Sequence, residues 1–97
     1  MTFELAFVEE ALSEWERLDG SVKQQFKKKI AQRLQSPRVA ASQLSGHKDR
    51  YKIKLRSVGY RLVYEVRDTE LLVLVLVLVV AVGRRDRNAV YRVSDTR

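Results

Sequence analysis

An alternating run of apolar and cationic side chains over Tyr51–Tyr64, YKIKLRSVGYRLVY, most constrains the fold of this chain. Successive side chains of an extended strand point to opposite faces. Ile53 and Leu55 therefore fall on one face, and Lys52 and Lys54 on the other. A short turn in the middle of the run leads into a second strand with the same pattern. The run predicts a β-hairpin with one face in the core and a basic surface on the other.

The same pattern predicts a register for the hairpin. Pairing Ser57 with Tyr60 around a two-residue turn sets apolar side chains opposite apolar ones, and it sets Arg56 directly opposite Arg61. A slip by one residue would move Arg61 to the core face, so the pattern disfavours it. Like charges directly opposite each other are destabilising, but on a wet surface they are useful if a phosphate lies between them.

The rest of the chain predicts an α+β domain with the element order β-α-α-β-β-β. An antiparallel sheet is expected to carry a helical hairpin on one face. Nothing in residues 1–97 suggests a linker, repeat or second domain, so one domain is expected. The last predicted strand is apolar on both faces, so we expect it either to be a central strand or to have its outer face covered by another chain. The expected strands cover residues 2–7, 51–56, 60–67 and 71–82, and the expected helices cover 8–18 and 21–35.

The charge of the chain favours a polyanionic partner. The net charge is +7 and the pI about 10.1. Residues 48–97 carry twelve Lys/Arg against six Asp/Glu, whereas residues 1–47 carry seven against six. The chain has no cysteine, which excludes disulfides and thiolate zinc sites. The acidic N-terminus is unlike a signal peptide, and the longest apolar run has twelve residues, fewer than the about 20 that span a bilayer. We expect a cytoplasmic protein with no membrane partner.

A second basic cluster follows the last predicted strand, in GRRDRNAVY. If that strand pairs with 60–67, the cluster adds Arg84, Arg85, Arg87 and Tyr91 to the basic face of the hairpin. His47 is the only histidine and lies outside the cluster. A nuclease of this composition would have to work with Lys, Arg and Tyr. RNA permits this, because its 2′-hydroxyl is an internal nucleophile and cations stabilise the charge that develops on the phosphate.

Four segments together resemble the RelE family of toxins from bacterial toxin–antitoxin modules. They are EALSEWERL, RLQSPRV, YKIKLRSVGYRLVYEV and VGRRDRNAVY, and they span nearly the whole chain in order. The resemblance implies a ribosome-dependent endoribonuclease that cleaves mRNA in the A site by 2′-hydroxyl attack. The products would be a 2′,3′-cyclic phosphate and a 5′-hydroxyl end, formed with no metal and no cofactor.

The resemblance also implies roles for individual residues. Lys52 and Lys54 match lysines that activate the nucleophile and hold phosphate, and Arg61 matches the arginine that stabilises the transition state. Arg85 matches an arginine that supports the leaving group, and Tyr91 matches the tyrosine that stacks on the base and serves as general base. Further contacts to RNA or the ribosome are assigned to Lys48, Arg50, Arg56, Arg84 and Arg87.

The implied partners are the 70S ribosome with its mRNA and a cognate RelB-like antitoxin, which should be acidic where it covers the basic face. Contact with operator DNA would come only through the antitoxin. Two alternatives remain. One is a ParE-type inhibitor of gyrase. The other is an inactive member that only binds RNA or the ribosome. The run LLVLVLVLVVAVG favours this alternative, because it is about four residues longer than the resemblance implies. At ~3.3 Å per residue, the point where the strand ends could shift by about 13 Å.

Overall fold

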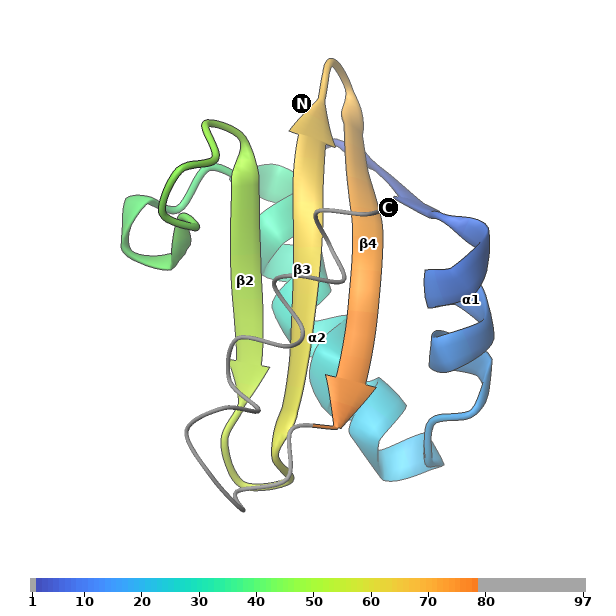
Figure 1. The fold of residues 1–97 in the computed structure, drawn as a ribbon. Helices are drawn as coiled ribbons and strands as arrows, with labels where there is room; N and C mark the ends of the chain where they lie inside the picture. The colour runs from blue at the N-terminus through green and yellow to red at the C-terminus, as the bar shows by residue number, and fades with distance from the viewer. Residues whose placement is uncertain (1, 79–97) are drawn as a thin grey trace.

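A computed structural model describes residues 2–78 as a four-stranded sheet with two helices, drawn in Figure 1. The order of the described elements confirms the predicted α+β arrangement β-α-α-β-β-β. A short 3-10 helix, Ala40–Ser42, interrupts the loop before the second strand. The elements are β1 (Glu4–Phe7), α1 (Glu9–Glu16), α2 (Gly20–Gln35), β2 (Arg50–Leu55), β3 (Tyr60–Arg67) and β4 (Glu70–Leu78).

The strand order across the sheet is β1-β4-β3-β2. β2, β3 and β4 form an antiparallel meander, as predicted. β1, however, pairs with β4 in parallel, from Glu4 with Glu70 to Phe7 with Val73. The expectation of a wholly antiparallel sheet is therefore wrong at this edge. The chain between β1 and β4 includes both helices and the hairpin, which is more than enough for the crossover that a parallel pair needs.

Both helices contribute to a core on one face of the sheet. α2 lies behind β2 and β3, α1 lies beside β4, and the two helices run in opposite directions (Figure 1). Buried Ala11 from α1 and Phe26 and Ile30 from α2 share this core with alternate residues of the three antiparallel strands. Trp15 is half-buried, and its ring lies between those of Phe7 and Phe26, with centroids 5.6 and 6.2 Å away. The expected helical pair on one face is confirmed.

β4 is central in the sheet, which is one of the two alternatives that its uninterrupted apolar sequence predicts. Val63 on β3 pairs with Val75, but Tyr64 pairs with Val73, so the register passes over Leu74. This is a β-bulge with one extra residue on β4. The bulge shifts the alternation: Leu74 and Val75 both belong to a second cluster with Val63, whereas Val73 belongs to the helix-side core. All these side chains are buried, so the strand is covered on both faces.

The hairpin differs from the predicted register by two residues. Leu55 pairs with Tyr60, and the connection is the four residues 56–59. A two-residue turn at Val58-Gly59 would need a positive φ at its first residue, which a β-branched side chain disfavours. Instead Val58 N–H donates to Leu55 O at 3.3 Å, and Gly59 takes the positive φ of 72°. A two-residue shift preserves the alternation, so the two faces of the hairpin are the predicted ones.

Candidate active site and its supporting contacts

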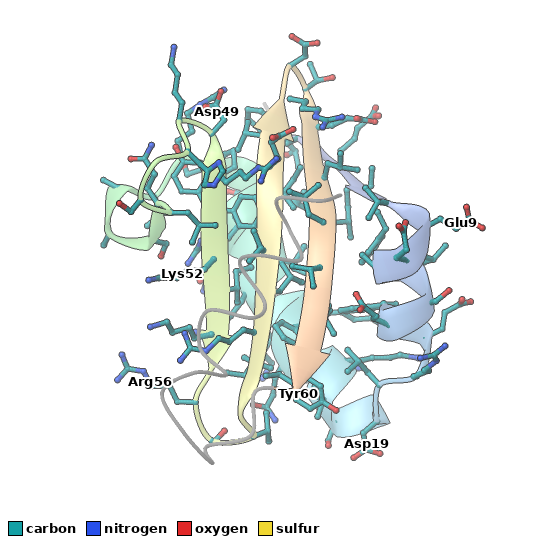
Figure 2. All side chains as sticks on the ribbon, viewed as in Figure 1. Glu9, Asp19, Asp49, Lys52, Arg56 and Tyr60 are labelled. Carbon is teal, nitrogen blue, oxygen red and sulfur yellow. The ribbon has the colours of Figure 1, made fainter. Side chains whose placement is uncertain are left out.

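Lys52, Lys54 and Arg61 lie on the face of the hairpin that points away from the helices. The other face of β2 is buried, with Ile53 and Leu55 only 1% and 4% exposed. We call the set Lys52, Lys54, Arg56 and Arg61 the basic face. Figure 2 shows Lys52 midway along β2 and Arg56 beyond its end, at the tip of the hairpin. The alternation of the sequence therefore brings together three of the five predicted catalytic residues.

Lys54 is directly opposite Arg61, which corrects the expectation that Arg56 would face Arg61. Val66 N–H donates to Asp49 O at 2.9 Å, so Asp49 belongs to the hydrogen-bonded pairs of the β2–β3 ladder. Lys54, five residues later, is then in a non-hydrogen-bonded pair with Arg61, with Cα atoms roughly 4.5 Å apart. Lys52 and Lys54 start about 6.7 Å apart along the strand. The three cationic side chains therefore start close enough together to contact the same phosphodiester group.

Arg50 and Lys48, predicted to contact RNA, lie at the opposite end of β2 from Arg56. Arg50 is 17% exposed, and its Nε donates to Glu65 Oε1 at 3.1 Å. Arg67 donates to the other oxygen of the same carboxylate. Partial burial alone would raise the pKa of Glu65, but the hydrogen bonds from Arg67 and Arg50 outweigh it and lower that pKa. Lys48 is exposed and lines an open pocket of about 330 Å³ together with His47 and these ion pairs.

A polar network lies on the core side of the hairpin, beneath Lys52. Arg33, on the last turn of α2, donates through Nη1 to Tyr64 Oη at 2.9 Å and to Lys52 O at 3.2 Å. Its Nη2 donates to Ser42 Oγ at 3.1 Å. Tyr64 Oη in turn donates to Pro37 O at 2.6 Å. Burial raises the pKa of Tyr64, although Arg33 opposes the shift.

Sequence reasoning missed the contribution of Arg33. The available signal was its spacing: Arg33 follows Phe26 by seven residues and Ile30 by three, so it extends the apolar stripe of α2. A cation at such a position needs an acceptor inside the fold. Tyr64 supplies one, and its ring also stacks on that of Tyr51, with centroids 5.6 Å apart and an interplanar angle of 24°.

The remaining predicted site residues, Arg84, Arg85, Arg87 and Tyr91, lie outside the described residues, as does the end of the long apolar strand. Within residues 2–78, no group of three or more His, Asp or Glu side chains is placed to hold a metal ion. A search of the same residues finds no helix long and apolar enough to cross a membrane.

Comparison with known proteins gives a consistent result. Residues 5–89 match the family described as the ParE toxin of the type II toxin–antitoxin system parDE. The mRNA interferase toxin RelE of Escherichia coli K12 is 50% identical over 91 residues, which is 94% of this chain and 92% of that protein. The crystal structure of the isolated E. coli RelE toxin superposes with a TM-score of 0.79 at 43% identity, covering 94% of this chain and 98% of the other. The toxin in the intact E. coli RelBE toxin–antitoxin complex gives a TM-score of 0.74 at 49% identity, covering 76% and 93%.

Proposed function

The chain belongs to the RelE branch of the RelE/ParE toxin family, and from that premise we propose that it is a ribosome-dependent endoribonuclease that cleaves mRNA in the ribosomal A site. Its relative of 50% identity bears the name mRNA interferase toxin. The proposed reaction is attack by the 2′-hydroxyl on the adjacent phosphate, giving a 2′,3′-cyclic phosphate and a 5′-hydroxyl end. No metal takes part in it.

The observation that carries this proposal is the placement of Lys52, Lys54 and Arg61 on one face of a hairpin whose other face is core. RNA supplies its own nucleophile, so the protein has to align it and stabilise the charge of the phosphorane. Lys54 and Arg61, side by side on neighbouring strands, can hold the two non-bridging oxygens. Lys52, two residues before Lys54 on β2, would lie toward the 2′-hydroxyl and favour its ionised form.

Two proposed catalytic groups come from the segment after β4. Arg85 would stabilise the charge on the departing 5′-oxygen. Tyr91 would stack on the base and accept the proton of the 2′-hydroxyl, for which nearby cations must lower its pKa. β4 runs antiparallel to β3 with Arg61 opposite Val77, so β4 approaches its end alongside the tip of the hairpin. This strand direction supports the proposal that Arg85 and Tyr91, which follow β4 in the sequence, act near the basic face.

The proposed partners follow from the charge and the family. The ribosome and mRNA would meet the basic face, Arg84 and Arg87, with Lys48 and Arg50 making outlying contacts. A RelB-like antitoxin with acidic side chains would cover the same face and block cleavage. A RelE toxin in complex with RelB is a precedent for such a pair. Operator DNA would be reached through the antitoxin.

The test is cleavage of a defined message on programmed ribosomes with an empty A site, with the ends mapped by primer extension. We expect cuts within the A-site codon that persist when free divalent ions are chelated and polyamines hold the ribosome together. Lys54→Ala, Arg61→Ala, Arg85→Ala and Tyr91→Phe should each reduce cutting, while ribosome binding persists.

The second candidate is inhibition of gyrase, which is favoured by the ParE description of the matching family. A supercoiling assay run with the same protein separates the two. Loss of supercoiling with no cleavage would replace our proposal. Ribosome binding with no cleavage would identify an inactive member.

A further inference from the structure

Lys52 has an unusual main-chain environment for a residue of an edge strand. Leu44 N–H donates to Arg50 O at 2.9 Å, and Gln43 forms an isolated antiparallel bridge with Tyr51, both on the side of β2 that faces away from β3. Carbonyls two residues apart point the same way along a strand. Lys52 O therefore also points away from β3, and the bridge does not extend to it. Instead, the Arg33 guanidinium donates a hydrogen bond to that carbonyl.

The guanidinium holds four parts of the fold together. It belongs to α2, and its three acceptors belong to the loop at Ser42, to β2 at Lys52 and to β3 at Tyr64. Tyr64 is fully buried, and its hydroxyl donates a further hydrogen bond to Pro37 O. The Arg33 carbon Cζ also lies 5.8 Å from the centroid of the Tyr64 ring. A planar, five-donor group can make several such bonds at fixed angles, which a lysine ammonium cannot reproduce.

We propose that Arg33 is a positioning residue for Lys52: it fixes the β2 backbone from behind, so that the Lys52 side chain leaves the opposite face in one direction. Arg33 itself lies on the helix side and does not touch RNA. The inference rests on the proposed function, because it gives Lys52 a role in cleavage. It goes beyond that function by assigning part of the catalytic rate to a contact in the fold.

The test pairs Arg33→Met with Lys29→Met. Lys29 is exposed on the same helix, so both variants lose one positive charge, but only the first removes the network. We expect Arg33→Met to lower the single-turnover cleavage rate at saturating toxin by about 10- to 100-fold, as small misplacements of catalytic groups do. The toxin concentration that gives half the maximal rate should stay within about 2-fold of wild type. Lys29→Met should match wild type in both.

A double-mutant cycle separates positioning from a general structural role. If Arg33 acts through Lys52, adding Arg33→Met to Lys52→Ala should reduce cleavage no further. An equal further reduction, or a wild-type rate in Arg33→Met, would overturn the proposal. Arg33→Lys is the milder variant if Arg33→Met does not fold; a fully active Arg33→Lys would also overturn it, since the fork geometry would then be unnecessary.

Backbone ¹⁵N relaxation of the wild-type and Arg33→Met toxins gives a readout that does not depend on cleavage. The amides of Lys52 and Ile53 flank the Lys52 Cα, and the Ile53 amide shares its peptide group with the carbonyl that Arg33 binds. Both amides should be rigid in wild type and more mobile in Arg33→Met, and equal order parameters in the two proteins would contradict the proposal. If Lys52→Ala cleaves at the wild-type rate, the catalytic role of Lys52 fails. The comparison of the wild-type and Arg33→Met relaxation data then still shows whether Arg33 holds the strand, so the two failures are distinguishable.

Discussion

Replacing Tyr64 with phenylalanine removes one oxygen atom from the interior and tests the network beneath the basic face. The hydroxyl accepts from Arg33 at 2.9 Å and donates to Pro37 O at 2.6 Å. Arg33 keeps two other acceptors, and Pro37 O keeps the N–H of Val39 at 3.1 Å, so neither partner is stranded. Two lost hydrogen bonds, one of them to a charged group, then destabilise the fold by about 2 kcal/mol.

The assay is urea unfolding followed by the fluorescence of Trp15, the only tryptophan of the chain. The Tyr64→Phe protein should unfold with a midpoint lower in proportion to that loss and an unchanged m-value. Tyr51→Phe is the matched control, because it keeps the same ring stack and its hydroxyl has no part in the network; it should change stability by less than about 0.5 kcal/mol. Both variants are made in an Arg85→Ala background to permit expression. Equal effects of the two substitutions would refute the reasoning.

Three further results are expected. The pKa of Glu65 in the folded protein lies below its ordinary value, so its ion pairs stabilise the fold fully above about pH 5. This stabilisation is lost as the pH falls through the folded pKa. In Glu65→Gln, the stability should therefore fall less between neutral and acidic pH than in wild type. Glu14 Oε1 accepts a hydrogen bond from the N–H of buried Leu76 at 3.1 Å. Glu14→Ala should therefore lower the free energy of unfolding by about 1–2 kcal/mol and speed hydrogen exchange at Leu76, and Glu14→Gln, which keeps an acceptor, should lower it less. The logarithm of the ribosome affinity should fall linearly with the logarithm of the salt concentration, and Arg56→Ala should reduce that slope by about one. An unchanged slope would mean that this arginine contacts no phosphate.

The sequence was sufficient to predict the two faces of the hairpin, because period-two alternation depends only on local chain geometry. It was insufficient for the register, since the choice between a two- and a four-residue turn depended on the φ preference of Val58. Both registers satisfy the apolar pattern equally. The pair Lys54–Arg61 was therefore beyond what alternation could decide, even though the face of each residue was predicted correctly.

Long-range features were the hardest to predict. The parallel pairing of β1 with β4 joins segments more than sixty residues apart in the sequence, and no local pattern marks it. The bulge at Leu74 lies in a run of leucines and valines, where any residue could be the extra one. Arg33 was hidden because a cation on a helix is usually solvated, and only the folded arrangement places three acceptors around it. The prediction for the segment with Arg85 and Tyr91 remains a prediction.

The measurement that tests the central claim most directly uses a message with a single 2′-deoxynucleotide at the cleaved position of the A-site codon. We propose that cations on the basic face act on a nucleophile that the RNA itself supplies. Wild-type toxin should therefore cut the all-ribose message on the ribosome, leaving a 2′,3′-cyclic phosphate, and leave the deoxy-substituted message intact at that position. Cleavage of the deoxy-substituted bond would contradict the account, since water or a protein group would then be the nucleophile.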